Sequence, residues 1–176
     1  MNLEELKNAT ESPTFNLKPL SKDAVQSALA KAEHYRLLNQ PSLAESICLD
    51  ILDVDAENQK AKIVLLLSLT DQFGTKQVKA KIALDLAKGL KDKYSQLYYL
   101  GIIHERQGNT ALGSSNPGSD FDAYEWYLEA LDYYAQADEI NPQGNEDVVL
   151  RWNTCARIIM EHHLKRRPKD SYPTLE

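Results

Sequence analysis

Cysteine, glycine and proline are scarce in this 176-residue sequence, which has two cysteines, seven glycines and seven prolines. Cys48 and Cys155 lie far apart and form no closely spaced pair of the kind that binds zinc or performs thiol redox chemistry. We therefore expect two reduced, buried thiols rather than a disulfide, and no metal site. The few glycines and prolines stand where turns are expected, which is typical of an all-helical protein.

Long apolar runs and positive charge are also limited. The longest apolar run, Ile63 to Leu67, is far shorter than the roughly 20 residues that cross a membrane. Residues 1–7 lack the basic-then-apolar order of a secretory signal, so we expect a cytoplasmic protein without a membrane partner. The net charge of −6 argues against a nucleic-acid partner. The basic run at 165–169 is expected to stabilise a helix end, with a targeting or nucleic-acid tail as the alternative.

Motifs for catalysis are missing from the sequence as well. It has no phosphate-binding loop, no zinc spacing and no nucleophile motif. His104 is followed by Glu105, and the pair His162 and His163 follows Glu161, but neighbouring residues on a helix point in different directions. We expect no catalytic residue and no cofactor, and we keep an enzyme or a small-ligand pocket in the mouth of the helical array as the less favoured alternative.

The most informative pattern that is present spans two expected helices. The pattern consists of bulky, small and ring residues at helical spacing, and it ends with a proline. Its members are Leu97, Leu100, Gly101, His104, Ala130, Tyr134, Ala137 and Pro142. Glycine inside a helix costs roughly 1 kcal/mol relative to alanine, so Gly101 requires a packing reason such as a closely packed second helix. Weaker copies lie upstream, because Ala32 precedes Leu66 by 34 residues and Leu66 precedes Gly101 by 35.

These residues resemble the tetratricopeptide repeat family. The expected domain covers 21–166, between an N-terminal tail and a C-terminal tail. Its parts are repeats at about 25–58, 59–93 and 94–142, an insertion at 109–129 and a capping helix at 145–166, with tails at 1–20 and 167–176. The resemblance implies an all-α fold of about seven helices, in which antiparallel hairpins stack into a right-handed superhelix, an α-solenoid. Leu66 stands where the family prefers a small residue, so the second hairpin is expected to be splayed or shifted.

The family geometry also implies a concave groove lined by the first helix of each repeat. The corresponding residues are Leu29, Glu33, Arg36, Lys60, Ile63, Leu67, Tyr98, Ile102 and Glu105. The lysines, arginine and asparagine that grip a chaperone's C-terminal tail are absent from their matching positions, so that partner is not expected. The apolar members of the set instead predict a seam for a helix of another protein or for the start of this chain, the alternative being that they are core.

The expected function is therefore a non-catalytic interaction scaffold or adaptor for a protein or peptide partner of unknown identity. A homo-oligomeric structural subunit is the alternative. The insertion contributes a second candidate surface, because the expected helices at 94–107 and 120–140 differ in length. The second helix is expected to extend beyond its partner and to carry an aromatic overhang of Phe121, Tyr124, Trp126 and Tyr127. The alternative is that these rings pack on neighbouring tyrosines or on the inserted loop.

The expected capping helix at 145–166 is amphipathic. A repeat array exposes the apolar face of its last hairpin unless another element covers it, and one amphipathic helix is enough. The residues expected to point inward are Val148, Val149, Trp152, Cys155, Ala156, Ile159 and Met160.

Overall fold

The computed structural model describes residues 15–74 and 78–168, and every regular element in this part of the chain is a helix. A short 3-10 helix, η1 (Lys22–Ala24), precedes the α-helices. These are α2 (Val25–Leu37), α3 (Pro41–Val54), α4 (Gln59–Thr70), α5 (Val78–Lys88), α6 (Lys93–Leu112), α7 (Ser119–Asp138) and α8 (Asp147–Glu161). The expectation of an all-α fold with about seven helices is confirmed for these residues. Most of both expected tails, 1–14 and 169–176, lies outside them.

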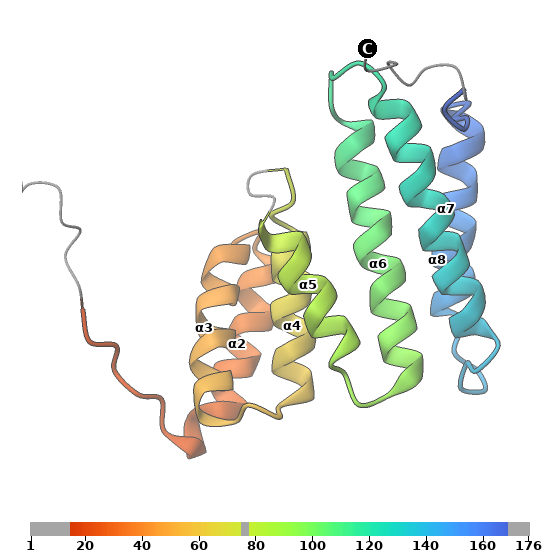
Figure 1. The fold of residues 1–176 in the computed structure, drawn as a ribbon. Helices are drawn as coiled ribbons and strands as arrows, with labels where there is room; N and C mark the ends of the chain where they lie inside the picture. Colours follow the sequence, from red (N-terminus) through yellow and green to blue (C-terminus); the bar gives the residue numbers. More distant parts are fainter. Residues whose placement is uncertain (1–14, 75–77, 169–176) are drawn as a thin grey trace, which may run out of the picture.

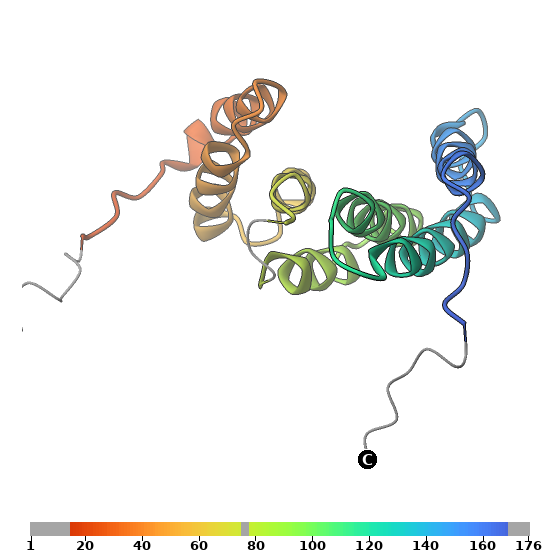
Figure 2. The ribbon, with the colours of Figure 1, turned by 90° about the horizontal axis from the view of Figure 1, so that it is seen from above.

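Successive helices pack against one another and run in alternating directions (Figure 1). Seen from above, α2, α4, α6 and α8 form one row, and α3, α5 and α7 form the other (Figure 2). The two rows follow an arc, with α2 and α8 at its ends. We call the surface of the first row that faces the inside of this arc the inner face, and the opposite surface the outer face.

The hairpin of α6 and α7 is held close by two glycines. A Cβ atom on Gly101 would overlap the ring of Tyr134, and a Cβ atom on Gly108 would lie 2.9 Å from Cε1 of Tyr127. Both tyrosine side chains are completely buried. The absence of a side chain on α6 therefore leaves the space that each ring of α7 fills, which is the packing reason expected for Gly101.

The expected aromatic overhang is wrong, because α6 does not end near residue 107. It continues to Leu112, and α7 begins at Ser119, so that the two helices have 20 residues each. Gly108 lies inside α6, where it packs against Tyr127, and does not form a turn. The expected insertion at 109–129 consists of the last turn of α6, a loop at 113–118 and the first half of α7.

Buried side chains form two core clusters. The first lies mainly among α2, α3, α4 and α5, and the second among α6, α7 and α8. Leu67, Tyr99 and Tyr133 pack against both clusters and join them. Leu66, the bulky residue at a position expected to be small, is completely buried in the first cluster. α2 packs directly against α4, whereas α4 and α6 approach each other less closely, so the junction between the clusters is looser than the step from α2 to α4.

The last helix, α8, covers the second cluster with only part of its apolar surface. Val148 and Cys155 are buried against α7, as expected. Val149, Trp152 and Met160 are 37%, 41% and 64% exposed, so the expectation that they point inward is wrong. Within the described residues the backbone of α8 packs closely on α7, and the side chain of Arg151 reaches α6. The side of α8 that carries Val149, Trp152 and Met160 stays open.

Candidate functional site

α4 lies in the middle of the inner row and is enclosed on nearly every side. From Ile63 to Thr70, every side chain is buried except those of Ile63 and Leu67. Lys60, one turn earlier, is exposed. Residues spaced three and four apart lie on one stripe of a helix, so these three side chains form a single accessible strip. We call Lys60, Ile63 and Leu67 the inner strip; all three are among the positions expected to line a groove.

The other expected groove positions divide into accessible and buried residues. On α2, Glu33 is exposed and Arg36 is half-buried, and Tyr98 on α6 is also half-buried. Leu29, Ile102 and Glu105 are only 4%, 2% and 6% exposed. The expectation of an exposed apolar seam therefore fails at Leu29 and Ile102, because Leu29 packs into the first core cluster and Ile102 into the second.

Glu105 is buried because residues of α7 and α8 enclose its carboxylate. Arg151 of α8 donates from Nη1 to both carboxylate oxygens, at 2.9 Å and 3.1 Å. The hydroxyl of Tyr134 donates to Oε2 of Glu105 at 2.6 Å. Burial, followed by the charge of Glu105, raises the pKa of Tyr134, so this phenol stays protonated. Glu105 thus connects three helices and is not available to a partner.

A second charged cluster joins the C-terminal ends of α2 and α4 to the second half of α6. Nε of Arg36 lies 2.7 Å from Oδ2 of Asp71, and Nη1 of Arg106 lies 3.5 Å from Oδ1 of the same carboxylate. Two guanidinium groups therefore share one carboxylate, and the three side chains together carry one net positive charge. This cluster places a positive charge at the end of the inner face.

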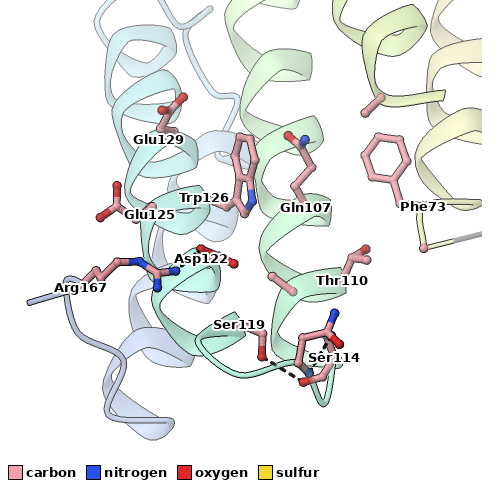
Figure 3. A pocket seen from close by; sticks show the side chains of 14 residues that line it. Phe73, Gln107, Thr110, Ser114, Ser119, Asp122, Glu125, Trp126, Glu129 and Arg167 are labelled. Carbon is pink, nitrogen blue, oxygen red and sulfur yellow. Dashed lines mark hydrogen bonds and ion pairs between the residues drawn. The ribbon is translucent and has the colours of Figure 1, made fainter. Parts of the chain in front are cut away.

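The outer face contains a cavity of about 940 Å³ beside the turn that follows α4. We call it the outer cavity. Phe73, Ala80, Ala111 and Trp126 supply apolar wall, and three carboxylates of α7 lie along one side: Asp122, Glu125 and Glu129. Trp126 projects from α7 toward α6, where Gln107 lies near it, and Phe73 stands on the opposite side (Figure 3). The guanidinium of Arg167 also lines the cavity, beside Asp122, so the cavity combines an apolar wall with a rim on which carboxylates outnumber cations.

The four residues of the expected overhang have different surroundings. Tyr127 is completely buried and donates from its hydroxyl to Oδ1 of Asn109 at 2.6 Å. Phe121 lies under the guanidinium of Arg167, whose Cζ is 5.2 Å from the ring centroid. Tyr124 is half-buried against the second core cluster. Trp126 is the member of the set that lines the outer cavity.

His104 supports Trp126 from inside the hairpin. Its ring lies between those of Trp126 and Tyr133, with centroid distances of 5.4 Å and 5.2 Å. Its Nδ1 is 3.6 Å from Oε2 of Glu129. Burial lowers the pKa of His104 more than the charge of Glu129 raises it, which favours the neutral ring at pH 7. The surroundings of His104 are those of a packing residue.

The described residues provide little for covalent or metal chemistry. Burial raises the pKa of Cys48 and of Cys155 to about 12, so both thiols are protonated and weakly nucleophilic at neutral pH. In the ranges 15–74 and 78–168, no group of histidine, cysteine, aspartate and glutamate side chains is placed to hold a metal ion. None of the helices in this part of the chain is both long and apolar enough to cross a membrane.

Sequence reasoning missed several residues that shape these surfaces: Asp71, Phe73, Arg106, Arg151 and Arg167. Arg151 and Arg167 follow the third repeat, and Asp71 and Phe73 lie just beyond the end of α4, so the repeat pattern assigns them no position. Only Gly108 gave a usable signal. It stands seven residues after Gly101, and Tyr127 stands seven residues before Tyr134, which is the spacing of two successive contacts between antiparallel helices.

Comparisons with known proteins add no family or function to this description. No model of a protein family, no curated protein and no solved structure matches the chain.

Proposed function

We propose that this protein is a non-catalytic interaction scaffold or adaptor of the cytoplasm, built from tetratricopeptide-like hairpins stacked as an α-solenoid. It binds a peptide or a helix of a partner protein on its inner face. The observation that carries this proposal is the inner strip, because from Ile63 to Thr70 α4 is buried except at Ile63 and Leu67, which continue the strip that begins at Lys60. The alternating hairpins of the arc and the close contact of Gly101 with Tyr134 support the repeat assignment.

The chemistry around the inner strip favours an amphipathic helix as the bound element. Ile63 and Leu67 provide apolar contact area, and Lys60, Glu33 and Arg36 provide charges of both signs around it. An amphipathic helix binds through its apolar face and keeps its polar face in water. Such a helix requires a surface with apolar contact area surrounded by charged groups. The charged groups fix the orientation of the bound helix, because each of them attracts a side chain of the opposite charge.

The test compares two pairs of substitutions against one partner. The partner is first captured from the native cell and identified by mass spectrometry, and its affinity for the purified full chain is then measured. Lys60→Glu with Ile63→Asp is expected to weaken binding by at least about tenfold. Leu49→Asp with Lys81→Glu changes exposed residues of the outer row by the same charges and is expected to leave the affinity within about twofold.

Circular dichroism must show that both variants are folded. Equal affinity of the inner-face variant and the control for the partner would overturn the proposal, and so would a larger loss in the control.

Self-association is the second candidate function, and α8 is the observation that favours it. Val149, Leu150 and Trp152 are exposed, and Val149 and Trp152 line a small cavity of about 380 Å³ against Tyr134. An apolar helix face at the end of an array is a surface on which a second copy can pack. Sedimentation over a range of concentrations tests this candidate. It predicts a dimer that Trp152→Glu converts to a monomer, and a wild-type chain that is monomeric throughout excludes it.

A further inference from the structure

α7 presents two sets of side chains that each combine an aromatic ring with carboxylates. The first set is Phe121 with Asp122, near the start of the helix. The second is Trp126 with Glu125 and Glu129, about one turn further along. The two sets differ in whether a cation occupies them.

The first set is occupied by an arginine of the same chain. Nη2 of Arg167 lies 2.6 Å from Oδ1 of Asp122, and its Cζ lies 5.2 Å from the centroid of Phe121. The same nitrogen donates to the backbone oxygen of Gly118 at 3.4 Å. A guanidinium placed over a ring and against a carboxylate gains both cation–π and charge-assisted hydrogen-bond energy. This contact shows which chemistry the acidic side of α7 accepts.

The second set has the same components, but no arginine or lysine of the described residues pairs with it. Glu125 is exposed and has no ion pair with any described residue, and the only ion-pair contact of Glu129 is with His104, whose burial favours the neutral ring. Gln107 adds a side-chain oxygen that is buried and accepts no hydrogen bond. Three hydrogen-bond acceptors therefore line the outer cavity together with Trp126, and none of them pairs with a positively charged side chain of the described residues. Arg167 lines the same cavity but pairs with Asp122.

We propose that the outer cavity binds an arginine of a basic segment in a partner protein, with the guanidinium on Trp126 between Glu125 and Glu129. Arginine fits better than lysine, because its planar head stacks on a ring while donating hydrogen bonds in its plane. The cavity of about 940 Å³ is much larger than one such side chain, and Phe73 and Ala80 offer apolar wall to residues beside the arginine. The site lies on the outer face and does not depend on binding at the inner strip.

The test uses a capped hexa-arginine peptide and the full chain in about 0.15 M salt, where weak long-range attraction is screened. The sequence has two tryptophans, so Trp152→Phe leaves Trp126 as the only reporter of fluorescence. In this background Glu125→Gln with Glu129→Gln is expected to weaken peptide binding by at least about tenfold. Asp50→Asn with Asp53→Asn removes the same charge from exposed positions of α3 and is expected to change affinity by less than about twofold.

Three results would overturn the proposal. The first is that hexa-arginine leaves the emission of Trp126 unchanged, and the second is that both pairs of substitutions weaken binding equally. The third is that free arginine amide at the same arginine concentration binds as well as the peptide, which would indicate a small guanidinium ligand. A hexa-lysine peptide of equal length is expected to bind more weakly than hexa-arginine. If the double variant is not folded, Glu125→Gln alone takes its place, because this side chain has no partner to lose.

Discussion

At the residue scale, the distance between α6 and α7 depends on the missing side chains of Gly101 and Gly108. Tyr134 and Tyr127 fill the space that these glycines leave, and their hydroxyls reach Glu105 and Asn109 on α6. Each ring thus packs against a backbone and also satisfies its polar atom, which a buried tyrosine requires. A glycine in a helix is tolerated here because the gain in packing exceeds its cost in helix propensity.

The first prediction follows from this balance. Gly101→Ala improves helix propensity by about 1 kcal/mol, but its Cβ atom overlaps the ring of Tyr134. We expect a net loss of about 1–3 kcal/mol in the free energy of unfolding, measured by urea denaturation. Gly113→Ala is the control, because this residue has φ −78° at the C-cap of α6 and a Cβ atom there would find ordinary contacts. Unchanged or increased stability of Gly101→Ala would contradict the packing argument.

The second prediction concerns His104. Because burial lowers its pKa, the unfolded chain binds a proton at this position more readily than the folded chain. Its contribution to stability is therefore complete above the unfolded pKa of about 6.5, and part of it is lost as the pH falls toward the lower folded pKa. His104→Phe keeps a ring between Trp126 and Tyr133 but does not titrate.

Urea denaturation at about pH 7.5 and about pH 5 measures this contribution. The variant is expected to lose less stability between the two pH values than the wild type loses. An equal loss in both proteins would show that His104 is not responsible for the pH dependence.

At the scale of elements, the ion pair of Glu105 and Arg151 attaches α8 to α6. Arg151→Met is expected to lower the free energy of unfolding by about 2–3 kcal/mol, because it leaves the Glu105 carboxylate buried without a counter-charge. Adding Glu105→Gln removes that charge, and the double variant is expected to be more stable than Arg151→Met alone. A double variant whose losses simply add would contradict a direct coupling between the two side chains.

The positions of the helices can be predicted from the sequence better than the residues that each helix leaves exposed. Turn residues and apolar spacing predict all the helices, and Gly101 predicts the close hairpin, because these signals are local. The expected helix end at residue 107 is wrong, because Gly108 continues α6, and its spacing from Gly101 matches that of the two tyrosines opposite. The exposed side of α8 and the carboxylate shared by Arg36 and Arg106 depend on the packing of helices that are far apart in the sequence. A local sequence pattern contains no information on that packing.

At the scale of the whole molecule, two core clusters meet at the looser junction between α4 and α6. The inner strip lies on α4 beside this junction, and Leu67 packs against both clusters. The inner face ends in the positive cluster of Arg36, Asp71 and Arg106, whereas the outer cavity is rimmed by carboxylates. The two faces therefore favour ligands of different chemistry. Residues of one face can be substituted without changing the residues of the other.

Hydrogen exchange of the full chain, with and without the captured partner, tests the central claim most directly. If the partner binds at the inner face, backbone amides within residues 60–67 and in the facing part of α2 will exchange more slowly in the complex. Amides of α3 and α5 will exchange at the same rate in both states. Slowed exchange that is confined to α3, α5 or α8, with residues 60–67 unchanged, would contradict the account.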